Sequence, residues 1–83
     1  MPNPTSTVSL TVKSPVMPLA KGGFYFDAER EGRVVLCIND PRFQVERPIL
    51  KINDAIVVEI LPDRPSDHVL YVTQVTKQRP RKW

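Results

Sequence analysis

The sequence predicts an all-β domain built as a small five-stranded barrel. Three observations lead to this prediction: apolar and polar residues alternate in several short segments, nine prolines fall between these segments, and no segment shows a convincing helical pattern. Proline fixes φ and lacks an N–H donor, so it occurs between strands and is excluded from helix interiors. Closing about five strands into a barrel removes their exposed edges. An SH3-like barrel is the alternative arrangement.

The expected strands are short and rich in β-branched or aromatic residues. In the first, Val8, Leu10 and Val12 alternate with polar residues, as they would on a strand with one buried face. Aromatic residues mark the second strand, and β-branched residues mark those that follow. In chain order, the expected strands cover residues 8–13, 24–26, 33–38, 55–61 and 68–76.

The connections between these strands contain residues that favour turns. Pro15 and Pro18 interrupt the chain after the first strand. Residues 42–50 form a looser stretch, for which we expect a short strand or a single helical turn. Asparagine, aspartate, glycine and proline supply the turn conformations elsewhere. The expected turns cover residues 27–32, 39–41, 51–54 and 62–67.

Chain length and charge limit the possible functions. Eighty-three residues form one domain with a thin core. We expect a flexible N-terminus at residues 1–5, the barrel at 6–76, and a basic, disordered tail at 77–83. The net charge is +3, and four of the twelve basic residues lie in that tail. The basicity therefore belongs to the tail, which argues against strong phosphate-driven binding by the barrel alone.

Neither catalysis nor a cofactor is expected. His68 is the single histidine, and its neighbour Asp67 would point to the opposite face of a strand, so no catalytic pair is predicted. Cys37 lies among apolar residues, where a thiol is usually a small buried side chain. The acidic residues lack the spacing of a metal site. A lone thiol, no signal-like N-terminus and no apolar run of ~18 residues lead us to expect a cytoplasmic protein without a membrane partner.

Residues 21–76 resemble the cold-shock domain, an OB-fold barrel that binds single-stranded RNA and DNA. The resemblance lies in three segments: Lys-Gly-Gly-Phe-Tyr-Phe at 21–26, Val-Val-Leu-Cys at 34–37, and Leu-Lys-Ile-Asn-Asp at 50–54, which leads into an alternating strand. The order of these segments matches the family over roughly two-thirds of the chain. The resemblance implies an OB-fold and a single-stranded nucleic-acid ligand.

In that family, exposed aromatic residues on two central strands stack on bases. The resemblance therefore implies that Phe24 and Phe26, which share one side of a strand, form a stacking platform if that side faces solvent. The alternative is that both rings fill the barrel interior and Tyr25 faces outward. The sequence departs from the family at Val35 and Cys37, where the family has an aromatic residue and a histidine. The tryptophan of the family's first strand is absent as well.

The leading hypothesis is a non-enzymatic protein that binds single-stranded DNA or RNA by aromatic stacking and a basic tail. For Phe43 the alternative is that it plugs the barrel end, and for Trp83 that it folds back on the surface. The rival hypothesis is a protein-interaction module, such as a phage or plasmid accessory protein that docks on a larger complex; a homodimer is compatible with either. The expected nucleic-acid-binding residues are Lys21, Phe24, Phe26, Arg33, Arg42, Phe43, Lys77, Arg79, Arg81, Lys82 and Trp83.

Overall fold

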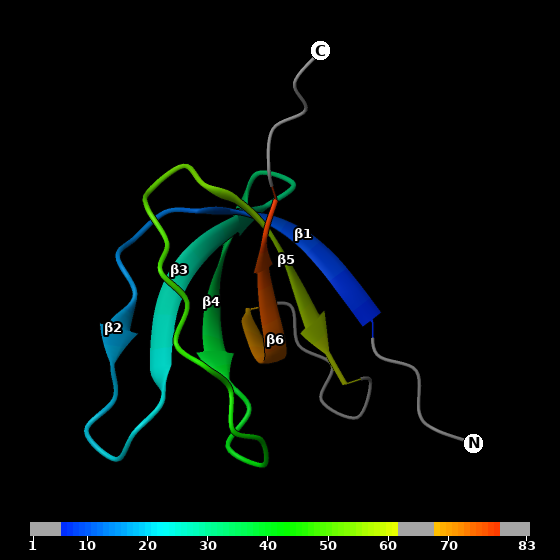
Figure 1. Ribbon diagram of the computed structural model, residues 1–83. Helices are drawn as coiled ribbons and strands as arrows, with labels where there is room; N and C mark the ends of the chain where they lie inside the picture. The colour runs from blue at the N-terminus through cyan, green and yellow to red at the C-terminus, as the bar shows by residue number, and fades with distance from the viewer. Residues whose placement is uncertain (1–5, 62–67, 79–83) are drawn as a thin grey trace.

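The computed structural model describes residues 6–61 and 68–78, which contain six β-strands and no helix. Five strands close into a barrel in the order β1-β5-β6-β4-β3, with β3 returning to β1, and the short β2 adds to β3 outside this ring (Figure 1). The predicted all-β, five-stranded barrel is therefore confirmed. The strands are β1 (Ser6–Val12), β2 (Met17–Pro18), β3 (Phe24–Arg30), β4 (Arg33–Asn39), β5 (Ala55–Ile60) and β6 (Val69–Lys77).

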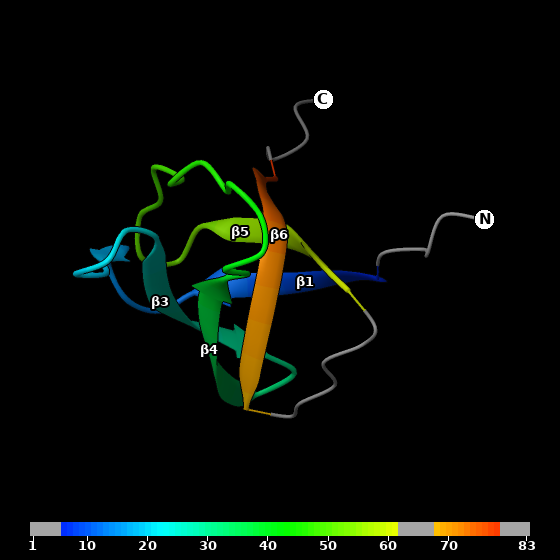
Figure 2. The ribbon, with the colours of Figure 1, turned by 90° about the horizontal axis from the view of Figure 1, so that it is seen from below.

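The strand pairing has the character of a small OB-fold-like barrel. Every paired neighbour is antiparallel except β4 and β6, which run parallel. A parallel pair requires a long connection, and the chain between β4 and β6 contains the whole of β5. Seen from below, β6 passes in front of β5 and β1, with β4 beside it (Figure 2). The OB-fold-like arrangement is thus favoured over the SH3-like alternative.

The core consists of alternate side chains from all five barrel strands. The inward positions predicted for the first strand, Val8, Leu10 and Val12, are all buried. Phe24 and Phe26 also point inward and are 0% exposed, with stacked rings whose centroids lie 6.3 Å apart. The prediction of an exposed stacking platform at these two positions is therefore wrong. Core packing is confirmed, because a thin core gains most from the largest apolar side chains available.

Strand β3 is longer than expected and includes residues placed in a turn. The turn is limited to Glu31 and Gly32, whose φ angles of 51° and 83° fit a two-residue type I′ hairpin. Arg30 and Arg33 are paired on either side of it. Asp27 and Glu29 lie on the outer side of the strand, where charged side chains reach water without breaking the alternation.

A register shift between β5 and β6 changes which side chains of the last strand face the core. Val72 pairs with Ile60 and Gln74 pairs with Glu59, so β6 has one extra residue at this point. The alternation of inward and outward side chains is therefore interrupted beyond Val72, and Val75 packs against the core. The strand also continues through Lys77, so the tail begins later than predicted, and residues 79–83 lie outside the described residues.

The long connection from β4 to β5 has no regular structure between residues 42 and 50, where a short strand or helical turn was expected. Val45 and Leu50 anchor it by packing against the core. The turn expected at 51–54 is confirmed, because the Asp54 N–H donates to the Lys51 carbonyl at 3.0 Å. The expected turn at 62–67 lies outside the described residues. In the part of the chain that is described, no helix is present that could cross a membrane.

Candidate functional site

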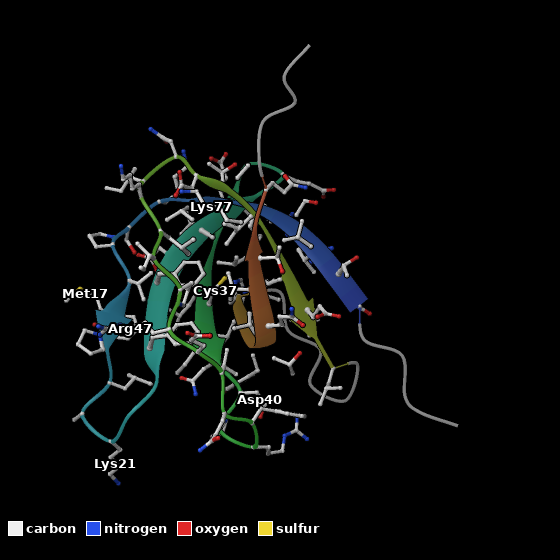
Figure 3. All side chains as sticks on the ribbon, viewed as in Figure 1. Met17, Lys21, Cys37, Asp40, Arg47 and Lys77 are labelled. Carbon is white, nitrogen blue, oxygen red and sulfur yellow. The ribbon has the colours of Figure 1, made fainter. Side chains whose placement is uncertain are left out.

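A groove of about 1030 Å³ lies at one end of the barrel, between the β2–β3 turn and the loop that follows β4. Figure 3 places Lys21 at the tip of that turn and Asp40 in that loop, both at the lower end of the molecule. Ligand pockets typically have volumes of 300–1,000 Å³, so this groove is large enough to hold a small ligand. The lining residues are Leu19, Ala20, Lys21, Gly22, Gly23, Ile38, Asn39, Pro41, Phe43, Gln44, Val45, Glu46 and Tyr71.

The groove combines aromatic side chains with polar groups. Phe43 is 44% exposed, and Tyr71 is half-buried, so both line the groove without being sealed in the core. Lys21 and Glu46 contribute one positive and one negative charge. The structure thus brings together Lys21 and Phe43, two of the residues predicted from the sequence. It adds Tyr71, which the sequence did not single out.

The outer side of the sheet extends this aromatic surface. Tyr25 pairs with Ile38, and Ile38 pairs with Tyr71, so the three side chains form a row across β3, β4 and β6. Met17 of β2 pairs with Tyr25 and continues the row. Directly paired residues share one side of a sheet. Tyr25 therefore faces outward, as expected if the neighbouring phenylalanines pack the core.

Two glycines shape the β2–β3 turn that forms one wall of the groove. Gly22 and Gly23 have φ angles of 93° and 95°, a region that side chains rarely adopt. The Phe24 N–H donates to Asn39 Oδ1 at 2.9 Å, which fastens the turn to the end of β4. A Cβ on Gly23 would overlap Asn39 Oδ1, whereas a Cβ on Gly22 would meet nothing.

This difference gives a matched pair of variants. Gly22→Ala should lower the free energy of unfolding by about 1–2 kcal/mol, the cost of the left-handed backbone. Gly23→Ala should cost a further 1–3 kcal/mol or so, because it also displaces the Asn39 side chain. Urea denaturation of both variants measures the difference. Equal losses would show that the contact between the turn and Asn39 does not hold this wall of the groove.

Arg42 is paired with a buried carboxylate within the protein. Asp40 is 0% exposed, and its Oδ1 accepts hydrogen bonds from the Arg42 backbone N–H at 2.9 Å and from Nε–H at 3.0 Å. The Arg42 Nη2 donates to Asp40 Oδ2 at 2.7 Å. This two-point pairing compensates the buried carboxylate. Arg42 therefore holds the loop that carries Phe43, and its expected phosphate contact stays a prediction.

Two of the remaining predicted cations, Arg33 and Lys77, are described by the structure, and both lie away from the groove. Arg33 is exposed at the far end of the β3–β4 hairpin. Lys77 is also at that end, where its Nζ lies 3.3 Å from Asp54 Oδ2. The pKa of Asp54 is lowered mainly because the Lys51 backbone N–H donates a hydrogen bond to its carboxylate. The Lys77 ammonium group lowers this pKa further. The predicted contacts at Arg79, Arg81, Lys82 and Trp83 lie outside the described residues.

Cys37 is sealed in the core, as its apolar surroundings suggested. Burial, aided by the negative charge of Asp27, raises the pKa of the thiol from 9.0 to about 12. At pH 8 the folded protein should therefore hold roughly a thousandfold less thiolate than an exposed cysteine, and a thiol reagent such as DTNB should react only as fast as the protein opens. Rapid stoichiometric labelling of the folded protein would contradict this placement.

No protein-family model, curated protein or solved structure matches this chain. Within residues 6–61 and 68–78, no three histidine, cysteine, aspartate or glutamate side chains are grouped to hold a metal ion. The groove and the distribution of charge are therefore the features from which a function can be assigned.

Proposed function

We propose that this protein binds single-stranded nucleic acid in the groove between the β2–β3 turn and the loop after β4. The supporting observation is that Phe43 and Tyr71 line this groove together with Lys21. OB-fold barrels bind oligonucleotides on the side formed by their second and third strands and at the loop between the first two. Here those strands are β3 and β4, and that loop includes residues 19–23 of the groove wall.

Stacking supplies most of the binding free energy in this proposal. Every base has a π surface, and each base stacked on an aromatic side chain contributes about 1–3 kcal/mol. Phe43 and Tyr71 provide such surfaces, and Tyr25 lies in the adjoining row. Lys21 is exposed at the edge of the groove, where its ammonium group reaches a phosphate. A base within a duplex is already stacked on its neighbours, so the groove favours unpaired strands.

A direct titration tests the proposal. A fluorescently labelled single strand and a duplex of the same sequence are titrated with the protein at low and moderate salt. We expect the single strand to bind more tightly than the duplex, with only modest preference for sequence, and binding to weaken as salt rises. Equal affinity for the duplex, or no binding of the single strand at low salt, would refute this function.

The charge balance of the groove favours one alternative, a protein-interaction module. Lys21 and Glu46 leave the lining without net charge, which also suits an uncharged peptide. A pull-down from nuclease-treated extract separates the two functions. One stoichiometric protein partner that survives nuclease and is lost on Phe43→Ala would favour peptide binding at this groove.

A further inference from the structure

The end of the barrel opposite the groove forms a continuous rim, in which four connected segments are joined by direct contacts. The Val12 N–H donates to the Asp54 carbonyl at 2.9 Å, and the Asn53 N–H donates to the Val12 carbonyl at 2.7 Å. Lys13 Nζ lies 3.1 Å from Glu29 Oε1, next to the β3–β4 hairpin. This rim, called the basic rim below, comprises residues 12–13, the hairpin 29–33, the turn 51–54 and Lys77.

The rim carries an excess of positive charge that its own acidic groups do not balance. Glu29 is paired with Lys13, and Asp54 is paired with Lys77. Among the described residues of the rim, this leaves one acidic residue, Glu31, and three exposed cations that form no salt bridge with another described residue, although Lys51 lies close enough to Asp54 to lower its pKa. These cations are Arg30, Arg33 and Lys51.

The basic tail is attached to this same rim. The Gln78 N–H donates to the Ala55 carbonyl at 2.8 Å, directly beside the 51–54 turn. Three more cations, Arg79, Arg81 and Lys82, follow within four residues of that anchor. At the groove end, by contrast, Lys21 is offset by Glu46, and Arg42 is paired with Asp40.

We propose that the basic rim is a second binding surface, which holds phosphates of a single-stranded nucleic acid beyond the part that occupies the groove. This inference rests on the proposed function, because it concerns the same ligand. The rim has cations but no aromatic side chain among its described residues, so it binds the backbone without reading bases. The groove holds bases, and the rim adds the sequence-independent, salt-dependent part of the affinity.

The separation of the two surfaces makes the effect depend on ligand length. Strand β3 runs from Phe24, next to the groove wall at Gly23, to the rim at Arg30, and six steps of about 3.3 Å each span roughly 20 Å. An oligonucleotide of about 4 nucleotides can occupy the groove but cannot reach the rim, whereas one of about 16 nucleotides can contact both. The longer oligonucleotide should therefore bind more tightly and show a steeper dependence on salt.

Binding of these two oligonucleotides to the full-length protein tests the inference. The triple variant Arg30→Gln/Arg33→Gln/Lys51→Gln should lower the affinity for the 16-mer by roughly tenfold or more, while the affinity for the 4-mer stays unchanged. The slope of log affinity against log salt concentration should fall by about 2 for the 16-mer. Lys21→Gln removes a charge at the groove end and should weaken both lengths. Glu31→Gln should raise the affinity for the 16-mer, and a variant that was partly unfolded could not show such an increase.

The outcomes separate this inference from the proposed function. If the wild-type protein binds neither length, the proposed function fails. If it binds the 4-mer but the 16-mer is no tighter, or if the triple variant leaves the 16-mer and its salt slope unchanged, only the rim inference is overturned. If the triple variant lost binding to polyglutamate but bound the 16-mer as well as the wild type does, the rim inference would also be overturned, in favour of an acidic protein partner.

Discussion

Phe43→Ala combined with Tyr71→Ala is expected to weaken the binding of a single-stranded oligonucleotide by about 2–6 kcal/mol, or roughly 30-fold to 10⁴-fold. Both side chains line the groove and keep ring surface accessible, so their removal takes away the two stacking contacts. Phe43 lies in an irregular loop and is 44% exposed, so its loss should cost the barrel little stability. Fluorescence anisotropy with a labelled single strand measures the loss.

Two controls separate stacking from general damage. Phe43→Leu keeps an apolar side chain but removes the π surface, so it should lose nearly as much affinity as Phe43→Ala, whereas Phe43→Trp should keep it. Val34→Ala removes an apolar side chain that is 65% exposed but does not line the groove, and it should bind normally. If Phe43→Leu binds as well as the wild type, or if both alanines are tolerated together, stacking in the groove is ruled out.

Phe26→Ala is expected to lower the free energy of unfolding by about 3–5 kcal/mol, the usual cost of removing a buried phenylalanine. The ring is 0% exposed and stacks on Phe24, which is equally buried, so no solvent can replace it. A domain of this size has a free energy of unfolding of only about 5–15 kcal/mol. A single truncation should therefore leave a large unfolded fraction under mild denaturant.

The neighbouring position on the same strand provides the control. Tyr25→Ala removes a ring of similar size from the outer side of β3 and should cost clearly less stability than Phe26→Ala. Thermal melts monitored by far-ultraviolet circular dichroism compare the two. If Phe26→Ala folded as well as the wild type and lost only binding, the ring would have to face the solvent after all.

The fold could be predicted because it follows from local pattern. Alternation at Val8, Leu10 and Val12 identified the first strand and its inward side, and the prolines indicated that helices are absent, which holds for residues 6–61 and 68–78. The errors came from effects with a longer range. The extra residue in β6 changes which side chains face inward after Val72, and no periodicity reveals such a bulge. Pairing with neighbouring strands extends β3 over charged residues whose types favour a turn, so the strand is longer than predicted.

The site was predicted only in part, for a physical reason. Aromatic residues at Phe24 and Phe26 satisfy the spacing of a stacking surface and of a core equally well, and only the side of the strand that faces the barrel interior decides between them. Lys21 and Phe43, both predicted as binding residues, line the same groove. Tyr71 was not, because it reaches the groove through the parallel pairing of β6 with β4, a contact between distant segments.

The most direct test of single-strand binding in the groove is a ¹⁵N-labelled protein titrated with an unlabelled oligonucleotide of about 4 nucleotides and followed by amide chemical shifts. We expect the largest shifts at residues 19–23, 38–46 and 71, which line the groove or lie between lining residues, while amides of the opposite rim move little. No shifts at saturating ligand, or the largest shifts at the rim and none in the groove, would contradict this expectation.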